Sequence, residues 1–309
     1  MGLRFMGDTA IQRIAILGFG EVGRIFGEDL AKGGIDVSSF DIAMTHPANG
    51  RALIAKAREL GIVPRPSFEE AMQGAEIVMS AVTASSALQV ATLAVPHLRP
   101  GQIYMDINSV SPDTKIAIER LTAPTGAGFV EGAVMAPVKP QRLKVPILLG
   151  GTPATGLAPR LKAAGMVTDA VSDRIGVASA IKMCRSIVMK GLAALAIESL
   201  FAARRYGAEN AVLASFDATY PSMGWNKGLA DTLVMRAVEH SRRRAAEMRE
   251  VAETLRSAGL TPRMAVATAE MQDWLTAEMD AGRYAWRPDA GFSWQAVADA
   301  MAEPNAHHQ

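Results

Sequence analysis

Residues 14–23 of the chain are Ile14-Ala15-Ile16-Leu17-Gly18-Phe19-Gly20-Glu21-Val22-Gly23. The first four are apolar, as in a short strand that is buried on both faces. Three glycines follow at the spacing G-x-G-x-x-G, and a helical pattern then runs over about residues 22–30, where Gly33-Gly34 ends it. A strand, a glycine turn and a helix in this order predict the opening unit of a doubly wound α/β sheet.

The same glycines predict a dinucleotide site. Gly18 allows the tight turn, Gly20 leaves room for a pyrophosphate to approach the backbone, and Gly23 lets the helix pack on the strand. The helix N-terminus offers free N–H groups to the phosphates. The cofactor-binding residues expected from this string are Gly18, Phe19, Gly20, Glu21, Val22 and Gly23. An ordinary strand–helix turn is the alternative interpretation.

The second predicted strand, residues 35–40, ends at Asp41, which lies 18 residues past Gly23. A carboxylate at this position accepts hydrogen bonds from the ribose hydroxyls of NAD and repels the 2′-phosphate of NADP. NAD is therefore the expected cofactor, although His46 and Arg51 are close enough in sequence to reach a phosphate and favour NADP. A turn former at a strand end is the alternative role for Asp41.

Short apolar runs and helical patterns continue to alternate up to residue 175. Further strands, the last preceded by a helix, are expected within residues 76–82, 102–107, 129–138, 145–149 and 156–174. After Gly176 the pattern is helical, and it begins with a long segment over residues 178–205. The sequence therefore predicts an α/β fold, with a Rossmann-type NAD-binding domain over residues 1–175 and an all-helical domain over residues 176–309.

Composition narrows the classes of function. The chain has 309 residues, 32 Lys and Arg against 31 Asp and Glu, and a formal net charge of +1. This balance favours neither a nucleic-acid partner nor an anionic membrane surface. The single cysteine, Cys184, lies in an apolar helical stretch, so we expect a packed thiol in a reducing compartment. No Cys/His cluster has the spacing of a metal site.

The apolar runs predict a soluble, cytoplasmic protein. The first run, residues 14–17, is cut short by the glycine turn, which argues against a signal peptide. No stretch approaches the roughly 18 apolar residues that a membrane span needs.

From about residue 12 to 205 the order of these features resembles the β-hydroxyacid dehydrogenase family, which includes 3-hydroxyisobutyrate and 6-phosphogluconate dehydrogenases. The rest resembles a divergent branch with a C-terminal domain of unknown function. The family's D-x-S-T-x-x-P segment corresponds to Asp106-Ile107-Asn108-Ser109-Val110-Ser111-Pro112. The resemblance implies that Asn108 and Ser109 contact substrate or nicotinamide, with Val82 of a neighbouring strand beside the cofactor. A plain strand–helix connection is the alternative.

Two further segments of the chain match the family's motifs. Glu131-Gly132-Ala133-Val134-Met135-Ala136-Pro137 corresponds to D-x-P-V-S-G-G, which holds a substrate carboxylate in the family. The apolar Met135 and a proline without an N–H argue against a simple carboxylate at that place. The motif G-x-G-x-x-x-K-x-x-x-N puts the family's catalytic lysine on Lys182 and replaces its asparagine with Ser186. These two residues are four apart and share one helix face, and burial beside Ile181 favours the neutral amine that a general base requires.

A polar stripe is expected in the helical domain. Arg236, His240, Arg243 and Glu247 recur at spacings of 4, 3 and 4 along one face of a helix. Better-known members of the family carry a Lys-Asp pair on this helix near the active site. Arg236 or His240 replaces that pair in one interpretation, by contacting an anionic group of the substrate. A solvated or subunit-facing stripe is the other.

The expected function is hydride transfer between NAD and a small β-hydroxy acid or related alcohol, with Lys182 as general acid and base. Two alternatives stay open: an imine or ketone reductase of similar architecture, and a dinucleotide-binding sensor without turnover. Imine reductases usually lack the lysine, whereas the altered segment at Met135 favours the sensor. The family's helical domains pair across a two-fold axis, so the resemblance implies a homodimer.

Overall fold

The computed structural model describes residues 10–287 and 291–301. The chain forms two compact units, Met1–Met183 and Cys184–Gln309, each of which is described by itself. The division lies within one long helix, whereas the sequence predicts a boundary just before that helix, at residue 175.

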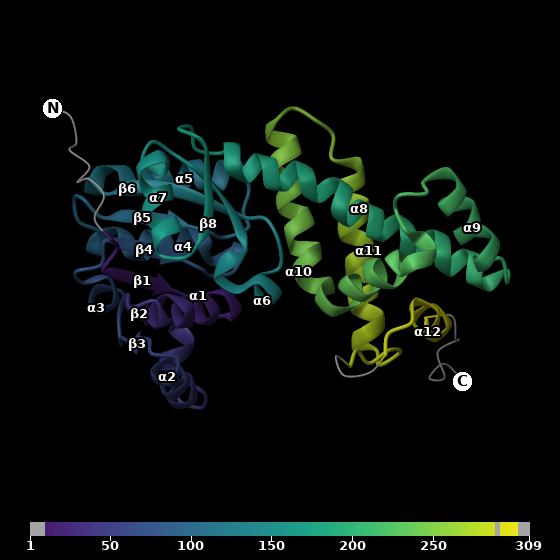
Figure 1. Ribbon diagram of the computed structural model, residues 1–309, viewed down its shortest axis with the longest axis horizontal. Coiled ribbons are helices and arrows are strands. Elements are labelled where there is room, and N and C mark those ends of the chain that lie inside the picture. The colour runs from purple at the N-terminus through teal and green to yellow at the C-terminus, as the bar shows by residue number, and fades with distance from the viewer. Residues whose placement is uncertain (1–9, 288–290, 302–309) are drawn as a thin grey trace. The chain divides into compact units, whose positions relative to one another are not determined.

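The first unit is built on one eight-stranded sheet with the order β3-β2-β1-β4-β5-β6-β7-β8 (Figure 1). Its strands are β1 Arg13–Leu17, β2 Asp36–Phe40, β3 Val63–Pro64, β4 Ile77–Ser80, β5 Ile103–Asp106, β6 Gly128–Val134, β7 Pro146–Gly150 and β8 Val167–Ser172. All neighbouring strands are parallel except β6 and β7. The order reverses at β1, where β2 and β4 lie on its two sides. Ligands of open α/β sheets bind outside the carboxyl ends of the strands at such a point.

Helices cover both faces of this sheet, as the alternation of side chains along β1 requires. Ile14 and Ile16 belong to a core that includes residues of α1, α2, α6 and α7, whereas Ala15 and Leu17 face α3, α4 and α5. These helices are α1 Glu21–Lys32, α2 Gly50–Glu59, α3 Phe68–Met72, α4 Ala87–Ala94, α5 Pro112–Thr122, α6 Val138–Gln141 and α7 Ala154–Ala163. Short 3-10 turns are η1 Ile42–Thr45, η2 Ala84–Ser86, η3 Val95–His97, η4 Ala123–Thr125 and η5 Arg142–Lys144.

Strand β6 is shorter than the sequence predicts. A strand was expected over residues 129–138, but β6 ends at Val134 and Val138 already begins α6. The N–H of Met135 still donates to Pro146 O at 2.9 Å, as a ladder bond would. Pro137 has no N–H to extend the ladder, and it becomes the residue that precedes the helix.

The second unit is helical. Its elements are the greater part of α8 Val177–Arg205, with α9 Glu209–Thr219, η6 Trp225–Lys227, α10 Leu229–Ser257, α11 Arg263–Asp280 and α12 Trp294–Ala300. Ion pairs join Arg242 to Asp280 at 2.5 Å and Arg249 to Asp273, so α10 and α11 run antiparallel. Apolar residues of α8, α10, α11 and α12 form the core of this unit.

Helix α8 differs in two ways from what the sequence predicts. By length and composition it is apolar enough to cross a membrane, so the expectation that no stretch approaches this limit was wrong. Half of its apolar window is buried within the fold, and the core helix of a soluble protein passes the same test. Cys184 is exposed instead of packed, whereas the neighbouring Met183 is buried, so the two side chains lie on different sides of α8.

Candidate functional site

The glycine turn after β1 has no room for side chains at two of its positions. Gly18 adopts φ +104°, and a Cβ there would lie 2.4 Å from Ala81 O and 2.8 Å from Cγ1 of Val82. A Cβ on Gly23 would lie 2.1 Å from Gly18 O. The turn therefore brings the start of α1 against β1 and against the end of β4, as a dinucleotide-binding turn requires.

The space around Gly20 is open, in contrast to the crowded surroundings of Gly18 and Gly23. Gly20 precedes α1 as the N-cap residue, with ordinary extended dihedrals, and a Cβ built on it meets nothing within 4 Å. Gly20 has no side chain with which to cap α1, and no side chain of the described residues is seen to bond the N–H groups of Glu21, Val22 and Gly23, so these groups are available to a ligand. An open backbone at an uncapped helix N-terminus fits the pyrophosphate of a dinucleotide. Phe19 contributes its backbone, because its ring is buried in the core.

The two glycines give a matched pair of variants. Gly20→Ala should keep the fold and weaken NAD binding about tenfold or more, since its methyl group occupies the path of the pyrophosphate. Gly23→Ala should instead destabilise the first unit by about 1–3 kcal/mol, because the clash is with backbone. Thermal unfolding and NAD titration measure the two effects separately. A Gly20→Ala protein that binds NAD as tightly as the wild type would contradict this placement of the cofactor.

Asp41 ties the end of β2 to the glycine turn. Its Oδ2 accepts a hydrogen bond from Phe19 N at 2.6 Å, and its Oδ1 accepts one from Ala43 N at 2.8 Å. A carboxylate has about four acceptor sites, so two of them remain for ribose hydroxyls. Asp41 thus acts as the turn former considered from sequence, and its second role, as a ribose ligand, stays a prediction.

A shallow hollow lies directly after Asp41. It is lined by Ile42, Ala43, Thr45, His46, Pro47, Asn49, Ala52 and Leu53. Ile42 is 78% exposed, so the hollow has an apolar rim next to the expected ribose position. His46 lines the hollow as well. A basic group therefore stays close to the place where the 2′-phosphate of NADP would bind.

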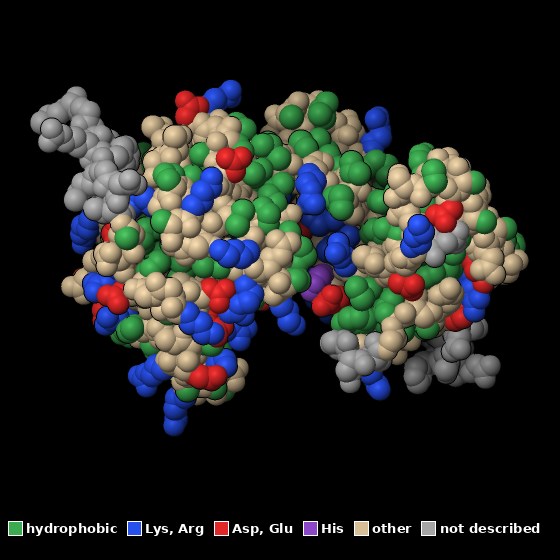
Figure 2. Space-filling view, in the orientation of Figure 1, with side chains coloured by type: hydrophobic (Ala, Val, Ile, Leu, Met, Phe, Trp, Pro, Cys, Tyr) green, Lys and Arg blue, Asp and Glu red, His purple; other side chains and the backbone are tan. Residues whose placement is uncertain are grey.

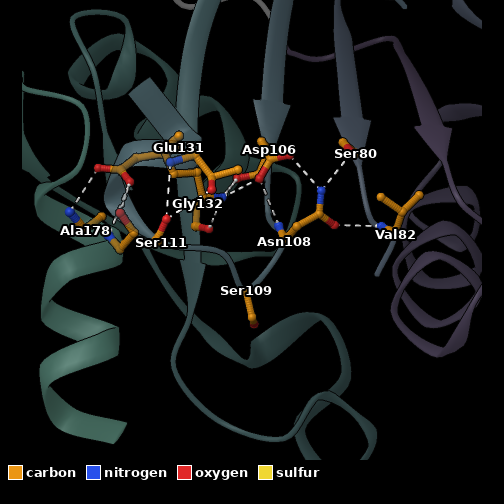
Figure 3. A network of polar contacts seen from close by, with 12 residues as sticks. Ser80, Val82, Asp106, Asn108, Ser109, Ser111, Glu131, Gly132 and Ala178 are labelled. Atoms are coloured by element: carbon orange, nitrogen blue, oxygen red, sulfur yellow. Dashed lines mark hydrogen bonds and ion pairs between the residues drawn. The ribbon is translucent and has the colours of Figure 1, made fainter. Parts of the chain in front are cut away.

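Asn108 holds the end of β4 instead of facing a ligand (Figure 3). Its Oδ1 accepts a hydrogen bond from Val82 N at 2.7 Å, and its Nδ2 donates to Ser80 Oγ at 2.9 Å and to Asp106 Oδ2 at 2.7 Å. The side chain is buried and these bonds occupy it. The prediction that Asn108 contacts the nicotinamide or substrate is therefore replaced by a positioning role. It fixes Val82 beside Gly18 and sets the direction of the next residue.

The same network contains a fully buried ion pair. Lys115 Nζ contacts Asp106 Oδ1 and donates to Asp106 O at 2.8 Å. Lys115 is 1% exposed and Asp106 is 0% exposed. Such a pair is tolerated only when further hydrogen bonds satisfy it, and Asn108 supplies them to Asp106. The pair anchors the carboxyl end of β5, where the residues around Ser109 begin.

Ser109 and Lys182 are brought together from positions that are 73 residues apart. Lys182 Nζ donates to Ser109 Oγ at 2.5 Å, and both side chains are partly buried. Ser109 points away from the buried network in Figure 3. Both residues belong to the first unit, in which Ser109 follows β5 and Lys182 lies in the second turn of α8. An amine and a hydroxyl in contact at the carboxyl edge of the sheet can transfer a proton to or from a bound alcohol.

The first turn of α8 is held by Glu131, a residue of β6. Its buried carboxylate accepts hydrogen bonds from the N–H groups of Gly176 at 2.7 Å, Ala178 at 3.0 Å and Ser179 at 3.2 Å, and from Ser179 Oγ at 2.7 Å. A carboxylate at a helix N-terminus satisfies orphan donors and interacts favourably with the helix dipole. Gly150 leaves the space for it, since a Cβ there would lie 2.5 Å from Glu131 Oε1. Glu131 therefore sets the position from which Lys182 extends.

Met135 and Ser186 are two more residues expected at the site. Met135 is partly buried after the end of β6, where its backbone N–H is bonded to Pro146. Ser186 belongs to the second unit, where it is buried and its Oγ accepts a hydrogen bond from Lys190 Nζ at 3.3 Å.

The polar stripe of α10 is interrupted. His240 has φ −132° and ψ 24°, which are not helical, and the kink breaks the regular spacing expected from Arg236 to Glu247. Arg236 is exposed, and His240 lies 3.4 Å from Glu239. Glu247 is mostly buried and pairs with Lys190 at 2.6 Å. The residues of this stripe therefore do not form one continuous solvated face.

Glu131, Lys115 and Lys190 were not recognised as functional or positioning residues from sequence. Glu131 bonds to residues that are 45 or more positions away, and Lys115 pairs with Asp106 across a strand end and a loop, so no helix or strand spacing reveals either partner. Lys190 follows Lys182 by eight residues, two helical turns, and this spacing was the available signal.

Two families match the chain. The NAD binding domain of 6-phosphogluconate dehydrogenase matches residues 13–170, and Domain of unknown function (DUF1932) matches residues 203–275. The first match contains the glycine turn, Asp41 and Ser109, and the second lies wholly within the helical unit.

Solved structures with the same architecture are known. A conserved hypothetical protein from Sinorhizobium meliloti 1021 is 36% identical, with 95% of this chain and 97% of that chain covered and a TM-score of 0.75. The 3-hydroxyisobutyrate dehydrogenase of Mycobacterium tuberculosis, solved with L-serine, is 16% identical over 95% and 100% of the two chains, with a TM-score of 0.74. A reductive aminase from Aspergillus terreus, in complex with NADPH and ethyl levulinate, is 15% identical over 94% and 99%, with a TM-score of 0.56. The last two likenesses show the fold.

The match to the first family covers more than half of the 309 residues and agrees with the sheet order, the glycine turn and the uncapped α1. The chain therefore carries an NAD(P)-binding domain and belongs to the family of the NAD binding domain of 6-phosphogluconate dehydrogenase, in the form that continues into a DUF1932 helical domain.

Proposed function

We propose that the protein is a dehydrogenase that transfers a hydride between NAD and a small β-hydroxy acid or related alcohol, with Lys182 as the proton-transferring residue. The observation that carries the proposal is the contact of Lys182 Nζ with Ser109 Oγ, at the carboxyl edge of a sheet whose glycine turn fits a dinucleotide. The family match and the likeness to a 3-hydroxyisobutyrate dehydrogenase support the same class of reaction.

In the proposed reaction the alcohol loses two hydrogens by different routes, one as a hydride from carbon and one as a proton from the hydroxyl group. On oxidation, the carbon loses a hydride, which the nicotinamide accepts when NAD is bound. The hydroxyl proton goes to the neutral amine of Lys182, and the product is a carbonyl compound. Ser109 accepts a hydrogen bond from Lys182, so its own hydroxyl hydrogen is directed to the substrate oxygen. Ser186, four residues after Lys182, is the second hydroxyl proposed for substrate contact.

Asp41 supports NAD over NADP in this proposal. Its carboxylate already accepts two backbone hydrogen bonds and keeps acceptor sites for ribose hydroxyls. The charge would repel a 2′-phosphate at the same place. Met135 replaces the residue that holds a carboxylate in the family, so the substrate's acidic group is proposed to bind elsewhere.

A screen for reduction of NAD and NADP tests the proposed function. The panel contains β-hydroxy acids, sugar acids and aryl-substituted alcohols, and absorbance at the nicotinamide band measures turnover. We expect turnover with NAD on at least one β-hydroxy acid and weaker turnover with NADP. Reduction of imines or ketones with no alcohol oxidation would support the reductase alternative. Tight NAD binding without turnover in either direction would support the sensor.

We propose in addition that the protein is a homodimer in solution and that the exposed side of α8 takes part in the contact. Val188, Met189 and Leu195 are large apolar residues of this helix, and Val188 is 68% exposed. Exposed apolar patches of this kind mark protein–protein contacts.

Val188→Glu should shift the protein from dimer to monomer at micromolar concentration, because it buries a charge in the contact. Light scattering after gel filtration measures the mass. Leu260→Glu is the matched control, since Leu260 is an exposed apolar residue that follows α10. A wild-type protein that is monomeric at micromolar concentration would contradict the homodimer, and a dimeric Val188→Glu protein would contradict the role of α8.

A further inference from the structure

The helical unit contains a cluster of charged groups that the proposed reaction does not use. Lys190 of α8 is almost fully buried and pairs with Glu247 of α10 at 2.6 Å. Arg243 lies 3.7 Å from the same carboxylate, and Arg244 is the next residue along the helix. All of these residues belong to the second unit.

Arg244 carries buried donors without partners. Its Nε and Nη2 atoms are both inaccessible to solvent and have no hydrogen-bond partner among the described residues. These two nitrogens are adjacent donors on one edge of the guanidinium group. That edge matches the two oxygens of a carboxylate or phosphate, which it binds with two parallel hydrogen bonds. A buried polar group left unpaired is uncommon in native proteins and requires an explanation.

The charges of the cluster do not balance. Lys190, Arg243 and Arg244 are cations, whereas Glu247 is the acid that acts on both Lys190 and Arg244. Burial, together with Arg243 and Arg236, lowers the pKa of Arg244 to about 10, although Glu247 opposes this. Burial likewise lowers the pKa of Lys190. An additional anion would relieve the repulsion among these cations.

The helix is also irregular at this place. The kink of α10 lies at His240, one turn before Arg244, although the helix has no proline there. Exposed Arg236 and Arg243 lie on either side of the kink and can attract an anion from solvent. Figure 2 shows Lys and Arg side chains on the surface over α8 and α10.

We propose that Arg244 and Lys190 form a binding site for the carboxylate or phosphate group of a small molecule. The Nε and Nη2 edge of Arg244 supplies the two parallel hydrogen bonds, and the ammonium group of Lys190 supplies a second positive charge. Glu247 orients Lys190 without neutralising the site. The inference does not depend on the proposed dehydrogenase activity, because it rests on contacts within the helical unit alone.

Thermal unfolding with added anions tests this site. Inorganic phosphate and succinate are titrated separately, with sodium chloride at equal ionic strength as the reference. The wild-type protein should gain in Tm with at least one of the two anions. A gain with phosphate alone identifies a phosphorylated ligand, and a gain with succinate alone identifies a carboxylic acid. The absence of a specific gain with both anions would overturn the proposal.

Arg244→Met makes the test sharper, because its two expected effects have opposite signs. Without anion the variant should have a higher Tm than the wild type, since it removes an unpaired buried charge and keeps the volume. It should also weaken the binding of the stabilising anion about tenfold or more. If Arg244 had only a structural role, Arg244→Met would lower the Tm and leave the anion response unchanged. That result would overturn the proposal.

Two control variants complete the design. Arg249→Met removes an arginine from the same helix, where it pairs with Asp273 on the surface, and should leave the anion response unchanged. Arg244→Lys keeps the charge and removes the paired donors, so it should keep only a weak response. A full response from Arg244→Lys would overturn the assignment of the two guanidinium donors. None of these measurements involves turnover, so failure of the site and failure of the proposed activity are distinguishable.

Discussion

Lys182→Met is expected to lower kcat for alcohol oxidation about 10²- to 10⁴-fold, the usual contribution of a general acid or base. The reason is that the variant keeps the length and apolar stem of the side chain and removes the amine that contacts Ser109 Oγ. The dinucleotide site lies at the glycine turn, so NAD affinity should stay unchanged. Stopped-flow or steady-state reduction of NAD measures the first quantity, and fluorescence titration with NADH measures the second.

Lys162→Met is the control for the loss of a lysine, since Lys162 is exposed on α7 and distant in sequence from the site residues. The pH dependence of kcat adds a second readout. The limb of the kcat–pH profile that reports titration of the proton-transferring group should disappear in Lys182→Met and should persist in Lys162→Met. Turnover within a few-fold of wild type in Lys182→Met would reject the general-base role and favour the imine-reductase alternative.

Lys115→Met is expected to destabilise the first unit by about 3–5 kcal/mol, because it leaves Asp106 as an uncompensated charge in the core. The wild-type pair is buried on all sides, and the methionine offers no hydrogen bond in return. Urea unfolding followed by far-UV circular dichroism measures the loss. The fluorescent tryptophans Trp225, Trp274, Trp286 and Trp294 all lie in the second unit, so their emission follows that unit separately.

Two further variants decide whether the unpaired charge is the cause. Asp106→Asn in the Lys115→Met background removes the charge and should recover part of the lost stability. Lys56→Met breaks a surface pair with Glu59 and should cost about 0.5 kcal/mol or less. A Lys115→Met protein as stable as Lys56→Met would show that the buried pair contributes no more than an exposed one.

The first half of the fold was predictable from local patterns. The apolar run 14–17, the three glycines and Asp41 specify a strand, a turn, a helix and a second strand at known spacings, and the structure has β1, α1 and β2 there. Each of these signals lies within a few residues of the element that it specifies. Lys182 and Ser109 were also selected from short motifs next to a strand or helix end; the structure brings the two side chains into contact, and their roles in substrate binding and catalysis stay predictions.

Features that depend on distant contacts were not predictable in this way. Asn108 was assigned to a ligand, but Ser80 and Val82 of another strand occupy its side chain. Cys184 was expected to be packed because its neighbours are apolar, but α8 is apolar around much of its circumference and periodicity does not identify the inner side. Lys190 and Arg244 lie on two different helices and are more than 50 residues apart in the chain, so neither helix alone indicates the cluster.

The hold of Glu131 on the first turn of α8 has a mechanical consequence. Because β6 and that turn are joined by four hydrogen bonds, the beginning of α8 behaves as an extension of the sheet. Lys182 follows this turn directly and belongs to the same unit as the sheet, which extends to Met183. The contact of Lys182 Nζ with Ser109 Oγ is therefore formed wholly within the unit that contains the glycine turn, and Glu131 braces the helix end that carries the lysine.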